Sequence, residues 1–182
     1  MTVAFDASML VYVVTPDAPA PIDPTTGKPV ERCGERIDHL LTTLQQSGAR
    51  VIIPTPALAE VLVKALDAAA EYLTQLTKSR HFSIRPFDIL AAVEHADIQR
   101  QRRNSGAAPK SSSRPKAKFD DQIFAIARIA QADTIYSDDP DIRKLCVHFG
   151  IACIGIAELP LPPEDPQMRL DLHQPDMDAE AA

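Results

Sequence analysis

The sequence has few cysteines, no long apolar stretch and no basic N-terminal segment. Its three cysteines (Cys33, Cys146 and Cys153) lack the spacing of a zinc site or a disulfide framework, so we expect reduced thiols that serve as small apolar side chains. Residues 1–14 contain no basic region, and Asp6 interrupts their apolar run, which argues against a signal peptide. No apolar run reaches the ~20 residues that a membrane-spanning helix needs. The sequence therefore predicts a soluble cytoplasmic protein without a membrane partner.

The charge of the chain is unevenly distributed. Its 182 residues, 45% hydrophobic and 24% charged, suit one globular domain with a single core. The net charge of −6 argues at first against a nucleic-acid partner. Between Arg100 and Lys118, however, seven residues are basic and none is acidic, which leaves 12 of the 19 basic residues, against 25 acidic ones, for the rest. A polyanion would meet such a protein at this basic segment.

Short apolar runs alternate with helical patterns along the chain. Strands are expected just before Asp6 and at residues 50–53, 82–86, 134–136 and 151–156. Helices are expected between them, at residues 32–48, 55–66, 68–78, 89–101, 120–130 and 141–149, and directly after Asp6. Strands separated by helices imply an α/β fold, a three-layer α/β/α sandwich with a central, mainly parallel sheet.

Proline-rich and basic stretches divide the chain further. We expect one domain over residues 1–157, with a Pro-rich loop at residues 15–31. A basic flexible insertion is expected at residues 101–118, where the composition is rich in Ser, Pro, Lys and Arg and no apolar period is present. Residues 158–182 form an acidic, Pro-rich tail.

Four carboxylates are expected to meet at one edge of the sheet. Asp6 and Asp138 follow predicted strands, while Glu60 and Asp120 lie near the starts of helices that can begin at the same edge. Taken singly, each has an ordinary interpretation as a helix cap, a solvated helical side chain or a turn residue. Together they would repel one another unless a cation shared the space. Ligands that are all oxygen favour Mg²⁺ or Mn²⁺ over zinc, which points to phosphate-ester chemistry.

Three stretches combine these acidic residues with the expected strands and helices. They are Val-Ala-Phe-Asp-Ala-Ser-Met-Leu-Val-Tyr at 3–12, Pro-Ala-Leu-Ala-Glu at 56–60, and Lys-Phe-Asp-Asp-Gln-Ile-Phe-Ala-Ile-Ala at 118–127 followed by Thr-Ile-Tyr-Ser-Asp-Asp-Pro-Asp at 134–141. Over about residues 2–157 they resemble the PIN domain, the fold of VapC-type toxins of toxin–antitoxin pairs. The third stretch, with its run to Asp138, is the most specific.

The resemblance implies a metal-dependent endoribonuclease, with one or two Mg²⁺ or Mn²⁺ ions that activate water for attack on an RNA phosphodiester. The products would carry 5′-phosphate and 3′-hydroxyl ends. Carried over by position, the catalytic and metal-binding residues are Asp6, Glu60, Asp120 and Asp138, with Asp139 as a further metal ligand. Asp121 follows Asp120 by ~100° around its helix and is expected to face solvent.

Polar and basic residues are expected to contact the substrate. Ser8 and Ser137 either add hydroxyl contacts in the site or make local turn bonds. The basic residues would attract the RNA backbone without reading its sequence, or else lie in a solvated loop without a partner. The residues assigned to substrate binding are Ser8, Ser137, Arg102, Arg103, Lys110, Arg114 and Lys116.

The resemblance also implies an antitoxin protein as partner and association into a homodimer, although no apolar stripe identifies the interface. Two other interpretations stay open. A phosphatase with Asp6 as nucleophile expects a second acid two residues on, where this chain has Ser8. A catalytically weak PIN-like module that binds RNA or protein would have no need to tolerate four clustered carboxylates.

Overall fold

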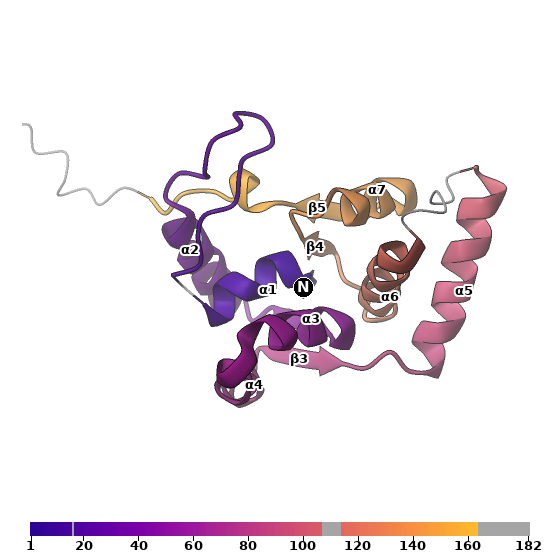
Figure 1. The fold of residues 1–182 in the computed structure, drawn as a ribbon, viewed down its shortest axis with the longest axis horizontal. Coiled ribbons are helices and arrows are strands. Elements are labelled where there is room, and N and C mark those ends of the chain that lie inside the picture. Colours follow the sequence, from indigo (N-terminus) through magenta and orange to yellow (C-terminus); the bar gives the residue numbers. More distant parts are fainter. Residues whose placement is uncertain (16, 107–113, 164–182) are drawn as a thin grey trace, which may run out of the picture.

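The computed structural model describes residues 1–15, 17–106 and 114–163 (Figure 1). Five strands form one sheet in the order β3-β2-β1-β4-β5, and every neighbouring pair is parallel. The strands are β1 (Thr2–Phe5), β2 (Arg50–Pro54), β3 (Phe82–Arg85), β4 (Thr134–Tyr136) and β5 (Ala152–Ile154). All five apolar runs that were expected to be strands lie in this sheet, and the predicted α/β fold is confirmed.

Helical segments connect each strand to the next. They are α1 (Ala7–Val14), α2 (Cys33–Gln46), α3 (Thr55–Ala65), α4 (Ala69–Lys78), α5 (Ile89–Asn104), α6 (Arg114–Ile129) and α7 (Pro140–Phe149), with the short 3-10 segments η1 (Leu66–Ala68) and η3 (Ile156–Glu158). In the described part of the chain, no helix is long and apolar enough to cross a membrane. The cysteines are free, as expected.

The sheet separates two apolar layers, because successive side chains of a strand point to opposite faces. On one face, Val3 and Phe5 of β1 pack with apolar residues of α2 and η3. On the other face, Ala4 of β1 packs with apolar residues of α3, α5, α6 and α7. This arrangement is the predicted three-layer α/β/α sandwich.

The strand order brings distant residues together at one edge of the sheet. β1 pairs with β2 on one side and with β4 on the other. Because β1 and β4 are parallel, the carboxyl ends of these two strands are neighbours. Phe5 pairs with Tyr136, and the N–H of Asp6 donates to the carbonyl oxygen of Tyr136 at 3.1 Å. Asp6 and Ser137 therefore lie side by side where the strand order changes direction, the usual place for a ligand site in open α/β sheets.

The segments between these elements differ in part from expectation. α5 runs to Asn104, beyond its predicted end at residue 101, and α6 begins at Arg114, before the predicted start at Asp120. The two helices therefore shorten the predicted basic insertion from both ends. Residues 107–113 and the tail beyond residue 163 lie outside the described part. The described residues of the Pro-rich loop (15–31) contain no helix, and an isolated antiparallel bridge joins Ile22 to Pro29.

The expectation that Asp121 faces solvent is wrong. Its side chain is fully buried between α5 and α6, the helices that Figure 1 shows packed beside each other. Arg102 donates to one of its carboxylate oxygens and Gln99 donates to the other. The side chain of Arg102 is itself only 14% exposed. Arg102 therefore joins the two helices, and little of its side chain is exposed for the contact with RNA that the sequence had suggested.

Replacing Arg102 with methionine should lower the free energy of unfolding by about 3–5 kcal/mol, because the change leaves the charge of Asp121 buried without its arginine. The matched control is Arg103→Met, at an exposed position one residue on, which should change it by less than ~0.5 kcal/mol. Urea unfolding followed by circular dichroism measures both. Small and equal effects would show that the ion pair does not hold α5 to α6.

Candidate metal centre

A cleft of about 550 Å³ lies at the carboxyl edge of the sheet. Residues of the β1–α1 junction, of α3, of α6 and of the turn after β4 line it. They are Asp6, Ala7, Ser8, Pro56, Ala59, Glu60, Val63, Lys64, Phe119, Asp120 and Asp139. The structure thus brings three of the four predicted catalytic carboxylates, Asp6, Glu60 and Asp120, to one place.

Asp6 is buried at the start of α1, with 5% of its surface exposed. Its Oδ2 accepts hydrogen bonds from the hydroxyl of Ser137 at 2.9 Å and from that of Ser8 at 3.1 Å. Burial raises the pKa of Asp6 above its usual value; the bonds from Ser137, the Ala7 backbone and Ser8 oppose this rise, and the charge of Asp139 adds to it. The ionised form of Asp6 is therefore costly in the protein alone, as expected of a carboxylate that meets a cation.

The two predicted serines connect Asp6 to the turn after β4. The hydroxyl of Ser8 accepts from the backbone N–H of Asp138 at 3.0 Å, and that of Ser137 accepts from the N–H of Asp139 at 3.0 Å. Each serine thus donates to Asp6 and accepts from the neighbouring turn. Ser137 is fully buried, so its hydroxyl positions Asp6 and is not exposed to a substrate.

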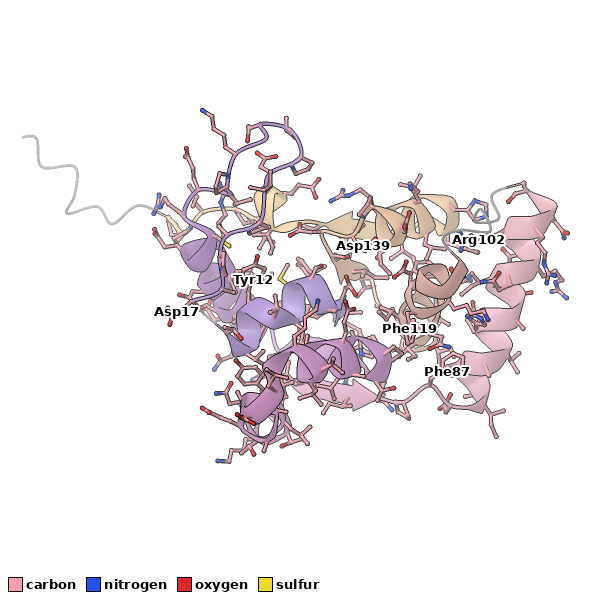
Figure 2. All side chains as sticks on the ribbon, viewed as in Figure 1. Tyr12, Asp17, Phe87, Arg102, Phe119 and Asp139 are labelled. Carbon is pink, nitrogen blue, oxygen red and sulfur yellow. The ribbon has the colours of Figure 1, made fainter. Side chains whose placement is uncertain are left out.

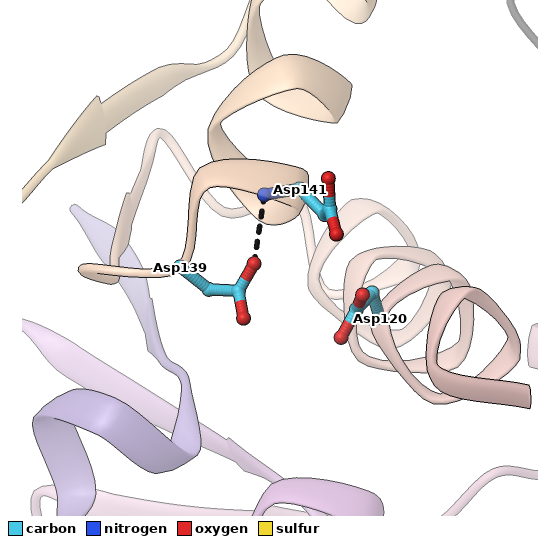
Figure 3. Close-up of side chains that lie close together, drawn as sticks. All are labelled: Asp120, Asp139 and Asp141. Atoms are coloured by element: carbon cyan, nitrogen blue, oxygen red, sulfur yellow. Dashed lines mark hydrogen bonds between the residues drawn. The ribbon is translucent and has the colours of Figure 1, made fainter. Parts of the chain in front are cut away.

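Three carboxylates lie close together, and two of them, those of Asp120 and Asp139, line the cleft. One oxygen each of Asp120, Asp139 and Asp141 lies within 4.8 Å of the others (Figure 3). Asp120 belongs to α6 and is 7% exposed, whereas Asp139 caps α7 and accepts from the N–H of Asp141 at 2.7 Å. This all-oxygen set suits a hard divalent cation such as Mg²⁺ or Mn²⁺.

Asp141 was not among the metal ligands predicted from the sequence. Its signal is the run Asp-Pro-Asp at residues 139–141, in which the first aspartate caps a helix and proline takes the first helical position. The second aspartate then falls in the first turn, at the same end of the helix as the capping carboxylate. A capping interpretation of Asp139 would therefore have placed Asp141 beside it.

Asp138 is not brought into the cleft. Its Oδ1 accepts from the backbone N–H of Ile156 at 2.8 Å. It also lies over Gly155, where an added Cβ would stand 2.6 Å from that oxygen. Asp138 thus lines a separate hollow with Arg143 and Glu158, and Asp139 takes the place predicted for it. Successive side chains of an extended segment point to opposite sides, so only one of two adjacent aspartates can enter the cleft.

The remaining predicted residues lie around or away from the cleft. Glu60 is on its α3 wall, 54% exposed, and accepts from Lys64 one turn later at 3.3 Å. Lys64 lines the cleft and was not predicted. Arg103 is exposed on α5 and donates to the carbonyl of Gln99, away from the residues that line the cleft. Lys110 and the side chains of Arg114 and Lys116 lie outside the described part.

The raised pKa of Asp6 makes a prediction about stability without metal. Below the unfolded-state pKa, near 3.8, Asp6 is protonated in both states and the burial of a charge costs nothing. As pH rises through the higher pKa of the folded state, the folded protein must ionise Asp6, so stability is lost. We expect Asp6→Asn, which cannot ionise, to become more stable relative to the unchanged protein between pH 4 and pH 7 in EDTA.

Thermal unfolding at each pH measures this difference. Addition of Mg²⁺ or Mn²⁺ at neutral pH should reverse its sign, because a bound cation stabilises the ionised carboxylate. A difference in melting temperature that stays constant with pH would contradict the raised pKa of Asp6.

At the level of sequence, no family model and no curated protein matches the chain. Solved structures resemble it over most of its length. A chain of VapBC2 from Rickettsia felis, bound to a promoter DNA fragment, aligns with a TM-score of 0.56 and 12% identity over 85% of this chain and 98% of that one. DNA-bound VapBC from Salmonella typhimurium aligns with a TM-score of 0.56 and 13% identity, over 86% of this chain and 98% of that one. FitAcB from Neisseria gonorrhoeae aligns with a TM-score of 0.54 and 17% identity, over 86% of this chain and 99% of that one. This chain therefore has the PIN-domain fold of the VapC-like and FitB-like proteins, as its sequence suggested.

Proposed function

We propose that the protein is a metal-dependent endoribonuclease that hydrolyses phosphodiester bonds in RNA. One observation supports this most strongly. The carboxylates of Asp120, Asp139 and Asp141 converge. Asp120 and Asp139 also line, together with the buried Asp6, a cleft at the edge of the sheet where α/β proteins bind their ligands. A fold alone does not determine an activity, so the proposal rests on this site and its chemistry.

The donor set fits a Mg²⁺ or Mn²⁺ ion. Asp120, Asp139 and Asp141 would hold it, with Asp6 facing it from the β1–α1 junction and Glu60 at the rim. When bound, such an ion lowers the pKa of a coordinated water and offsets charge on the phosphate oxygens. Ser8 and Ser137 keep the carboxylate of Asp6 in one orientation, and Lys64 supplies a positive charge for a phosphate near the rim.

We extend the proposal to the partner of the protein. The solved VapBC and FitAB structures it resembles are complexes, and several of them are bound to DNA. By analogy, we propose that this chain is the toxin of a toxin–antitoxin pair that binds a cognate antitoxin protein. A homodimer and a cytoplasmic location belong to the same proposal.

Two neighbouring aspartates offer a matched test of the site. Asp139→Asn removes a carboxylate from the cleft and keeps a residue that caps helices well. Asp138→Asn changes the next carboxylate, outside the cleft, and keeps an acceptor for the N–H of Ile156. With single-stranded RNA and Mg²⁺ or Mn²⁺, we expect Asp139→Asn to slow cleavage by more than ~100-fold, since even outer-shell partners of a metal change activity by 10- to 100-fold. Asp138→Asn should stay within a few-fold of the unchanged protein, and EDTA should abolish cutting.

The outcomes separate the proposed nuclease from its main alternative. Equal losses in the two variants would contradict the assignment of Asp139. If the folded protein binds metal, measured by calorimetry, and binds RNA but cuts no RNA, then it is a PIN-like binding module and the nuclease proposal fails.

A further inference from the structure

Phe119 is exposed at the cleft, directly before Asp120 on α6. It is 59% exposed, and among the described residues it is the one aromatic side chain in the set of large exposed apolar residues. The core-facing side of α6 is already filled by the buried Ile123, Phe124 and Ile126. Packing of the fold therefore does not explain an aromatic residue at position 119.

The side chain of Phe119 lines the same cleft as the carboxylates. Figure 2 shows Phe119 between α3 and α6, on the same side of the molecule as Asp139. Ala59 and Val63 of α3 form the facing apolar wall. The cleft volume of about 550 Å³ falls within the range of ligand sites, roughly 300–1,000 Å³, and is large enough for a nucleotide.

The charges of the cleft favour a contact to nucleic acid that does not depend on charge. Four carboxylates line it, those of Asp6, Glu60, Asp120 and Asp139, against the single basic residue Lys64 among the described lining residues. Without a bound cation such a lining repels a polyanion, and Lys64, which also pairs with Glu60, offsets only part of this charge. A base that stacks on an aromatic face adds attraction that does not depend on charge, and every base has such a face.

We propose that Phe119 is a stacking platform for an unpaired base beside the phosphodiester bond that is cut. The inference rests on the proposed function and narrows its substrate to RNA that is single-stranded at the cleavage point. Phe119 and Asp120 line the same cleft, so a base held by the first brings its own phosphate towards the carboxylates. In a duplex the bases are stacked on one another and are not available to the phenyl ring.

A tryptophan at this position reports stacking directly. The chain contains no tryptophan, so Phe119→Trp introduces a single tryptophan, whose emission is quenched when a base stacks on it. Combined with Asp139→Asn, which we expect to slow cleavage by more than ~100-fold, the variant can be titrated with RNA in Mg²⁺ before most of the RNA is cut. The matched control is Val147→Trp in the same background, at a position on α7 that is 78% exposed and does not line the cleft.

For the Phe119→Trp protein we expect saturable quenching by a short single-stranded RNA and at least ~5-fold weaker binding of the same sequence as a duplex. The Val147→Trp control should show no saturable quenching. This measurement requires no cutting, so it decides the role of Phe119 even if the nuclease proposal fails. Equal quenching by duplex and single strand, or no quenching by either, would overturn the inference.

The kinetic arm uses variants that separate an aromatic face from apolar bulk. Phe119→Ala and Phe119→Leu should raise KM for single-stranded RNA by about 5- to 100-fold, the range that stacking contributes per base, with kcat changed little. Phe119→Tyr keeps the ring and should stay close to the unchanged protein. If Phe119→Leu behaves as the unchanged protein, and a cognate antitoxin rather than RNA alters the emission of the Phe119→Trp protein, the surface binds protein and the inference is wrong.

Discussion

The hydrogen bonds from Ser8 and Ser137 to one oxygen of Asp6 are the constraint on which the site depends. Asp6 and Ser137 are 131 residues apart and meet because β1 lies between β2 and β4. Each hydroxyl donates to Asp6 and also accepts from the turn that carries Asp139. One pair of serines thus fixes a carboxylate at the start of α1 and the first turn of α7 relative to each other. The sheet supplies the proximity, and the hydroxyls supply the orientation.

The fold and the edge that carries the site could be predicted from the sequence. Short apolar runs separated by helical patterns require a parallel sheet, and parallel strands end at a common edge. That reasoning was enough to place Asp6, Glu60 and Asp120 around one cleft. It was enough because these positions depend on where strands and helices begin and end. The period of the apolar residues and the residues typical of helix starts indicate those boundaries.

The details that failed depend on which way a side chain points. Asp138 and Asp139 are adjacent, and only the path of the turn after β4 decides which of them enters the cleft. Asp121 is buried because Arg102 and Gln99 reach it from another helix, 19 and 22 residues earlier in the chain. No local sequence pattern around Asp121 indicates such a partner. The position of a carboxylate on its own helix is therefore a weak guide to its exposure when the preceding helix carries an arginine that can reach it.

The ion pair between Arg102 and Asp121 has a consequence for how this chain can vary. Arg102 lies near the C-terminal end of α5 and Asp121 in the middle of α6, so the two helices are joined by a contact inside the protein that does not depend on residues 107–113. The entropy of closing a loop grows only slowly with its length. Residues could therefore be added or removed between the two helices at little thermodynamic cost and without moving Asp120. The junction is a natural point for lengthening the chain, for inserting a tag or a second domain, while the carboxylates keep their places.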